Sequence, residues 1–223
     1  MKTTFLIIIL CWLACQSPAQ NSISIEAGFL GTYTSIAEYP SIGRTDFLLD
    51  SMKLFQNVVS FHAALTANIE LGKKFFLSTG FHYSRKGLKE VDYTDNDGYI
   101  WYTSAKQYYL GLSVLLGYKF RLKNSRFGFQ FATGTQADFA IGTPNGGALF
   151  SGSYHRFFMP FSRFNEVDLS WVAEGGCNYK LGPGDILVKL TYHYGLSDVL
   201  EDPFVIGRSM SFGISAGYSF NLR

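Results

Sequence analysis

Ionisable residues recur at every second position in several segments of the chain, and they are the first candidates for chemistry. They are Glu26, His62, Glu70, His82, Lys119, Arg121, Asp138, Asp168, Glu174, Lys180, Lys189 and His193. Such groups can act as general acids and bases, or can carry protons. Where they are buried they more often form structural ion pairs, because an isolated buried charge is very costly. We favour a structural polar network, with a proton relay or a catalytic centre as the alternative.

Three aspartates, Asp92, Asp95 and Asp97, have a composition that a calcium site would need. If Gly98 took the sixth position of an EF-hand loop, Tyr93 would be the first ligand and Ser104 the twelfth, and neither carries the required carboxylate. The sequence Asn-Asp-Gly at 96–98 is better explained as a turn. No cofactor and no metal site is therefore predicted, although weak calcium binding stays open.

A stretch rich in aromatic residues and arginine forms a candidate partner-binding loop. Its members are Phe150, Tyr154, Arg156, Phe157, Phe158, Met159, Phe161, Arg163 and Phe164. Exposed aromatics beside arginine are typical of binding surfaces. The alternative is that these side chains pack at the rim of the fold or lie in a lipid interface.

Residues 106–122 best show which elements position these residues. In this segment apolar and polar residues alternate strictly with period two. One face carries Tyr108, Leu110, Leu112, Val114, Leu116, Tyr118, Phe120 and Leu122, and the other is rich in glycine and polar groups. A strand rises about 3.3 Å per residue, so a tilted strand spans about 25 Å between Tyr108 and Tyr118. That is the height of the apolar band of a transmembrane barrel. A soluble lipocalin-like barrel, with the apolar face turned inward, is the alternative.

Seven further segments alternate in the same way and predict strands. They are residues 22–34, 58–71, 75–85, 127–139, 167–180, 186–194 and 211–221. The connections are long at 35–57, 87–105, 141–165 and 197–207, and short at 72–74, 123–125 and 182–185. Long outer loops and short periplasmic turns are characteristic of outer-membrane barrels. The sequence therefore predicts an all-β fold, an eight-stranded antiparallel up-and-down transmembrane β-barrel.

The N-terminus predicts export from the cytoplasm. Lys2, an apolar run over residues 5–14 and the small residues Ser17 and Ala19 are typical of a cleaved signal peptide. We expect residues 1–19 to be removed and residues 20–223 to form the barrel. Cys15 raises the alternative of a lipoprotein, but Trp12 stands where an aliphatic residue is usual. Cleavage would leave Cys177 alone, so no internal disulfide is expected.

Blocks of the sequence also resemble the PorT-type outer-membrane β-barrel proteins of Bacteroidota. They are Thr-Gly-Phe-His-Tyr-Ser-Arg-Lys-Gly at 79–87, the strand at 108–120, residues 167–176 and Tyr-His-Tyr-Gly-Leu at 192–196. The resemblance implies an eight-stranded barrel in the outer membrane and a link to protein secretion, and it brings no catalytic residues. The end of the chain, from Ser215 to Leu222, resembles the signal read by the barrel-assembly machinery.

Our first functional hypothesis is a non-enzymatic outer-membrane barrel that acts in surface interaction or as an accessory to secretion or envelope assembly. Its expected surroundings are outer-membrane lipid and lipopolysaccharide, with an envelope or secretion protein as partner. Nucleic acid is excluded as a partner because the net charge is +2 and no basic stripe is present. Eight strands enclose an interior that side chains can fill, so no general-porin channel is expected.

The second hypothesis is a lipid A-modifying enzyme, an acyl hydrolase that uses His82 and Ser84. Two residues two apart on a strand share a face, and a histidine beside a serine is the arrangement that acyl transfer needs. Outer-membrane lipid A deacylases follow their serine with Asn-Ala-Gly, whereas Arg85, Lys86 and Gly87 follow Ser84. Mass spectrometry of lipid A from cells with and without the protein distinguishes the two hypotheses.

Overall fold

The computed structural model describes residues 21–38, 55–56, 58–90, 93–94, 100–123, 125–151, 156–160, 165–198 and 205–222. In this part of the chain every regular element is a strand. In chain order they are β1 (Ser22–Glu38), β2 (Phe55–Gln56), β3 (Val58–Glu70), β4 (Phe75–Glu90), β5 (Tyr93–Thr94), β6 (Ile100–Arg121), β7 (Phe127–Ser151), β8 (Arg156–Pro160), β9 (Val167–Leu181), β10 (Gly184–Gly195) and β11 (Val205–Asn221). The described residues include no helix with the length and apolar character of a membrane span.

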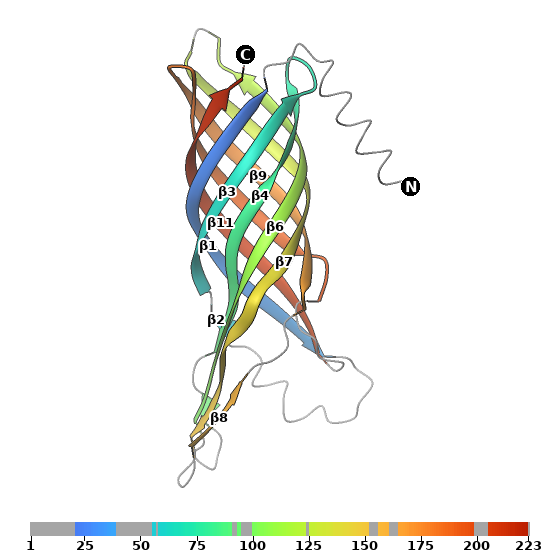
Figure 1. The fold of residues 1–223 in the computed structure, drawn as a ribbon, viewed down its shortest axis with the longest axis vertical. Helices are drawn as coiled ribbons and strands as arrows, with labels where there is room; N and C mark the ends of the chain where they lie inside the picture. The colour runs from blue at the N-terminus through green and yellow to red at the C-terminus, as the bar shows by residue number, and fades with distance from the viewer. Residues whose placement is uncertain are drawn as a thin grey trace, which may run out of the picture.

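Eight long strands close into a barrel (Figure 1). The ring runs β1, β3, β4, β6, β7, β9, β10 and β11, and each neighbouring pair is antiparallel. The last strand returns to the first, from the pair Ser22 and Asn221 to the pair Glu38 and Val205. The predicted fold, an eight-stranded antiparallel up-and-down barrel, is confirmed.

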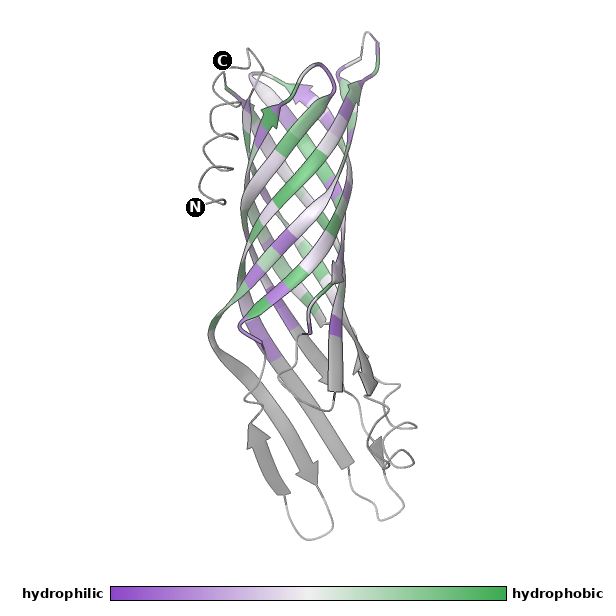
Figure 2. Ribbon diagram, turned by 90° about the vertical axis from the view of Figure 1, so that its right-hand side faces the viewer, coloured by the Kyte–Doolittle hydropathy of each residue, from purple (hydrophilic) through white to green (hydrophobic). Residues whose placement is uncertain are grey.

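The two faces of β6 show why this sequence folds with its apolar side outward. Leu116 and Val114 are 54% and 51% exposed, while Leu115 and Ser113 between them are 2% and 1% exposed. Green apolar bands therefore alternate with polar positions along the strands of the barrel wall (Figure 2). An outer surface of this kind is stable in hydrocarbon and not in water. The lipocalin-like alternative, which needs the apolar face inside, is wrong.

Aromatic side chains gather toward both ends of the apolar surface. Near the short turns, rings pair at Phe75 and Tyr118, Phe120 and Phe129, Phe127 and Tyr179, and Tyr218 and Phe220. Toward the other end, rings pair at Tyr83 and Tyr108, Trp171 and Tyr192, and Tyr192 and Phe212. Two such girdles mark the interfaces of a membrane barrel.

The short connections lie together at one end, beside the C-terminus (Figure 1). The turn after β3 and the turn after β9 contain Gly72 and Gly182 with φ of 135° and 62°, a backbone region that favours glycine. Because outer-membrane barrels place short turns in the periplasm, this end is the periplasmic end.

At the opposite end the strands run further than the sequence predicts. β6 begins at Ile100 and β7 continues to Ser151, although 87–105 and 141–165 were expected to be loops. β4 follows β6 out to the pair Lys89 and Ser104, and β8 adds to the outer edge of β7. The loop boundaries from sequence are therefore wrong on this side. Beyond the membrane no lipid selects one apolar face, so alternation weakens while pairing continues.

A break in register separates this extension from the barrel. Between Lys106 and Tyr108 the pairing of β6 with β7 shifts, and Gly142 opposite has φ of 72°. The buried Gln107 side chain donates from its amide nitrogen to the carbonyl oxygens of Ile141 and Tyr108, both at 3.0 Å. The Gln107 side chain thus supplies hydrogen bonds to backbone carbonyl groups near the bulge.

Candidate functional site: the polar interior of the barrel

Lys189 is the centre of the first interior ion-pair cluster. Its ammonium lies 2.6 Å from Glu26 Oε1 and 3.5 Å from Glu174 Oε2. The hydroxyls of Ser215 and Thr66 donate to Glu26 at 3.3 and 3.4 Å. The residues come from β10, β1, β9, β11 and β3, so the cluster joins strands from across the barrel. Lys189 is 3% exposed, and its pairing is what makes a buried ammonium tolerable.

Lys86 is the centre of a second cluster, on the side of the long connections. Its ammonium lies 2.6 Å from Asp138 and 2.5 Å from Asp168, and both carboxylates are fully buried. Gln136 donates to Asp138 at 2.7 Å, and Ser209 donates to Asp168 at 2.9 Å. The ring of Tyr109 lies under the ammonium, 5.1 Å from it.

Sequence reasoning missed Lys86, which it treated only as part of Arg85-Lys86-Gly87 after Ser84. Continuing the period-two pattern of His82 and Ser84 by one step would have placed Lys86 on the inner face. Asp185 was missed for a related reason. The sequence assigned it to a turn, but β10 already begins at Gly184.

The histidines form a third group between these clusters. His82 Nε2 lies 2.6 Å from the Ser113 hydroxyl, and His82 Nδ1 lies 3.4 Å from His62 Nε2, with the two rings stacked. His193 is 4% exposed, and both of its ring nitrogens lack a hydrogen-bond partner within the described residues. The described chain contains no group of three or more histidine, cysteine, aspartate or glutamate residues placed to hold a metal.

His82 and Ser84 do not form the pair that acyl transfer needs. Both are buried on the inner face of β4, but His82 bonds to Ser113, and the Ser84 hydroxyl has no partner in the described part of the chain. Ser84 is 1% exposed, so a lipid acyl chain cannot reach it from the outer surface. The geometry gives no support to the hydrolase hypothesis.

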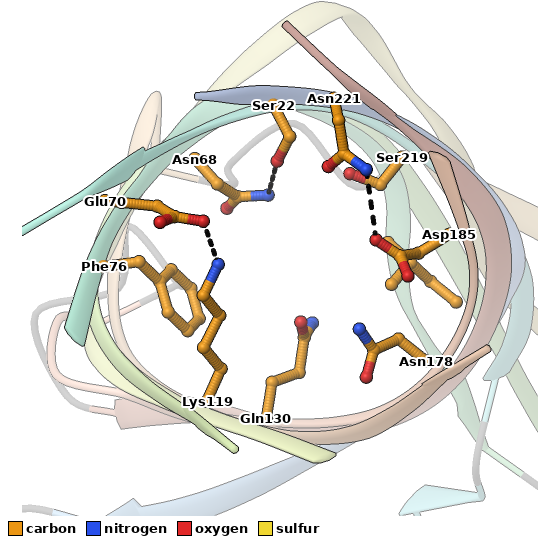
Figure 3. Close-up of a pocket in the computed structure, with 11 residues that line it drawn as sticks. Ser22, Asn68, Glu70, Phe76, Lys119, Gln130, Asn178, Asp185, Ser219 and Asn221 are labelled. Carbon is orange, nitrogen blue, oxygen red and sulfur yellow. Dashed lines mark hydrogen bonds and ion pairs between the residues drawn. The ribbon is translucent and has the colours of Figure 1, made fainter. Parts of the chain in front are cut away.

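The periplasmic mouth holds the remaining residues of the predicted network. Lys119 pairs with Glu70, and Arg121 pairs with Asp185 at 2.7 Å. The side chains around this mouth point toward the barrel axis (Figure 3). Just inside it, Phe76, Leu115, Ala132 and Val172 form a small apolar cluster. A Cβ at Gly117 would lie 2.2 Å from the Phe76 ring, so only glycine lets this ring pack there.

All ten residues proposed from sequence as an interior network lie on inward-facing strand positions: Glu26, His62, Glu70, His82, Lys119, Arg121, Asp138, Glu174, Lys189 and His193. The structure groups them into separate clusters, and the cluster at the periplasmic mouth is the most solvent-exposed. His193 is inward-facing, but its ring nitrogens have no hydrogen-bond partner among the described residues.

Of the candidate partner-binding loop, Phe150 lies on β7, and Arg156, Phe157 and Phe158 lie on β8. Phe150 pairs with Phe157 in the β7–β8 ladder. Tyr154 and Arg163 lie outside the described residues, as do the aspartates at 92, 95 and 97 and the predicted signal peptide.

Comparison with solved structures gives the same fold. The chain is similar to neisserial surface protein A, with 15% identity, a TM-score of 0.50, and coverage of 92% of this chain and 100% of that one. It is also similar to AlkL in lipid bilayers (12% identity, TM-score 0.45, 93% and 94% covered) and to Ail of Yersinia pestis (16%, 0.40, 90% and 99%). At 15% identity, the likeness to neisserial surface protein A shows the fold alone.

Comparison of sequences gives the family. Among curated proteins none matches this chain. The family model described as "Outer membrane protein beta-barrel domain" matches residues 18–201, most of the sequence. Together with the closed barrel and its apolar outer face, this places the protein in the outer membrane. The chain belongs to the outer membrane protein beta-barrel domain family.

Proposed function

We propose that the protein is a non-enzymatic outer-membrane barrel whose extracellular β-sheet extension binds a protein partner. The extension consists of the outer parts of β4, β6 and β7 together with β2, β5 and β8. The role that we assign to it is surface interaction, or assistance to secretion or envelope assembly. The observation that carries the proposal is the continuation of paired strands from the barrel wall to Ser151, beyond the bulge at Gln107.

A paired sheet presents one defined surface, whereas a loop would present many different surfaces. β8 has β7 on one side and no partner strand on the other within the described residues. An unpaired edge offers backbone N–H and C=O groups to which an extended segment of another protein can add. The residues that supply this edge, 156–160, have the sequence Arg-Phe-Phe-Met-Pro, which is rich in the aromatic side chains typical of binding hot spots.

The polar interior supports a role outside the barrel lumen. Lys189 and Lys86 each link carboxylates from two other strands, and the histidines fill the space between them. No acid–base–nucleophile set reaches the surface among the described residues. The interior is therefore a structural support for the wall, and the resemblance to PorT-type proteins favours an accessory role in secretion.

Chemical cross-linking in intact cells, followed by affinity capture of the tagged protein, tests this proposal. A variant with residues 145–164 replaced by a short Gly-Ser linker removes β8 and the outer part of β7. We expect it to lose the cross-linked partner. A control with residues 199–204 replaced in the same way should keep that partner. Equal capture by both variants, with both folded in the membrane, would contradict the proposal.

A further inference from the structure

At the periplasmic end the barrel interior opens into a cup, which leads into a recess lined by the residues drawn in Figure 3. The cup has a volume of about 480 Å³ and narrows to a deeper recess of about 40 Å³. Phe76 and Leu187, both buried, lie at the recess. A charged group that enters from the periplasm can be solvated in the cup but not past this apolar level.

The lining of the cup is predominantly cationic. It includes Lys73 and Lys74 from the turn after β3, Lys119 and Arg121 from the end of β6, and Lys180 from the end of β9. Two carboxylates, Glu70 and Asp185, lie among them. Positive charge thus exceeds negative charge in a concave site, which concentrates the field on an anion.

The two carboxylates are already engaged. Glu70 pairs with Lys119, and Asp185 pairs with Arg121 at 2.7 Å. Neither Lys73 nor Lys180 has an ion-pair partner within the described residues, and both are exposed. The excess charge of the cup is therefore carried by lysines that are free to bind an incoming anion.

Side-chain amides complete the wall between the lysines and the recess. Asn68, Gln130, Asn178 and Asn221 line the recess, and Figure 3 shows Gln130 and Asn178 pointing toward its centre. The side-chain oxygen of Asn178 has no hydrogen-bond partner in the described structure. Amides both donate and accept, so they complement the N–H and C=O groups of a peptide backbone, while the lysines complement carboxylates.

We propose that this cup binds an acidic peptide segment of a periplasmic protein. The amides and the inner cations Lys119 and Arg121 face the barrel axis, whereas phospholipid headgroups lie outside the barrel wall. A headgroup would have to cross the rim to reach them and would leave its acyl chains in water. An extended peptide enters along the axis with no such cost, and its carboxylates meet the lysines at the rim.

The test uses the full-length mature protein in phosphatidylcholine nanodiscs and a fluorescein-labelled hexaglutamate peptide, with binding followed by fluorescence anisotropy. We expect binding that weakens with added salt, because the contacts are exposed charges. The double variant Lys73→Gln/Lys180→Gln removes two cations from the cup. It should weaken binding by about fivefold to tenfold, the effect of two exposed ion pairs.

The matched control is Lys123→Gln/Arg126→Gln, which removes two exposed cations at the same end that do not line the cup. It should change the affinity by less than about twofold. Equal weakening by both double variants would show a general surface field and overturn the proposal. Absence of hexaglutamate binding at low salt would also overturn it, as would variants that alter only association with phosphatidylglycerol vesicles, the sign of a lipid-headgroup site. These outcomes do not depend on the extracellular extension.

Discussion

Lys189 on β10 lies 2.6 Å from Glu26 on β1, although 163 positions separate the two residues in the chain. The same ammonium reaches Glu174 on β9. This one contact can form only when the barrel has closed through β11, which lies between β10 and β1. The ion pairs among these interior residues therefore depend on closure of the sheet. The first prediction concerns the removal of one of their charges.

Replacement of Lys189 by methionine leaves the buried carboxylate of Glu26 and the half-buried carboxylate of Glu174 without their cation. We expect Lys189→Met to lower the free energy of unfolding by about 3–5 kcal/mol, the usual cost of breaking a buried pair. Urea unfolding in lipid vesicles, followed by tryptophan fluorescence, measures the change. Lys123→Met, at an exposed turn, is the control and should change stability by less than about 0.5 kcal/mol. Equal effects would mean that the cluster contributes nothing specific.

Glycine at position 117 leaves space for the ring of Phe76 inside the barrel. We expect Gly117→Ala to destabilise the protein by about 1–3 kcal/mol because the added methyl overlaps the ring. Gly175→Ala is the matched control, since a Cβ there would meet only the Phe131 side chain at 3.5 Å. The double variant Gly117→Ala/Phe76→Leu should recover part of the loss. Without that recovery, the clash is not the cause.

The apolar outer face defines the depth of each residue in the membrane. Val114 lies midway between Tyr108 and Phe120 on β6, Leu122 follows the periplasmic end of this strand, and both side chains are exposed on the outer face. Val114→Arg should cost about 2–4 kcal/mol and Leu122→Arg no more than about 1 kcal/mol, because the cost of arginine falls toward the interface. The same vesicle unfolding assay measures both. Similar costs at the two sites would contradict the assigned membrane position.

Cleavage of the signal peptide has a simple chemical consequence. If residues 1–19 are removed, Cys177 is the one cysteine of the mature chain. We expect the intact mass of the protein purified from membranes to begin at Gln20, with one thiol titrated per chain. Cys177 is free and faces outward, so a fluorophore attached there should be quenched by brominated lipids. Three thiols, or an acylated Cys15, would disprove this cleavage.

The sequence predicts this fold only where one face of each strand meets lipid. Between Tyr108 and Phe120 every second side chain must be apolar, so the strand and its faces are readable from one sequence. Outside the membrane that requirement ends, and neither the continuation of β6 to Ile100 nor the bulge at Gln107 leaves a periodic signal. The bulge depends on Gly142 and on a side chain that bonds to carbonyls on the facing strand.

The partners of the interior residues were beyond sequence reasoning for a different reason. Alternation shows that Asp138 and Asp168 face inward, but not that Lys86 lies between them. That contact depends on the stagger between the strands, because Lys86 is 52 positions from Asp138 and 82 positions from Asp168 in the chain. Stagger follows from closure of the whole ring and has no local signature.

We propose that the function of this barrel lies in its exposed surfaces, because its closed interior is filled by paired side chains. Planar-bilayer recording of the purified, folded protein tests it most directly. We expect no long-lived, large-conductance openings, because eight strands enclose a space that Lys189, Lys86 and their partners fill. Reproducible porin-sized conductance steps from pure protein would contradict the closed interior.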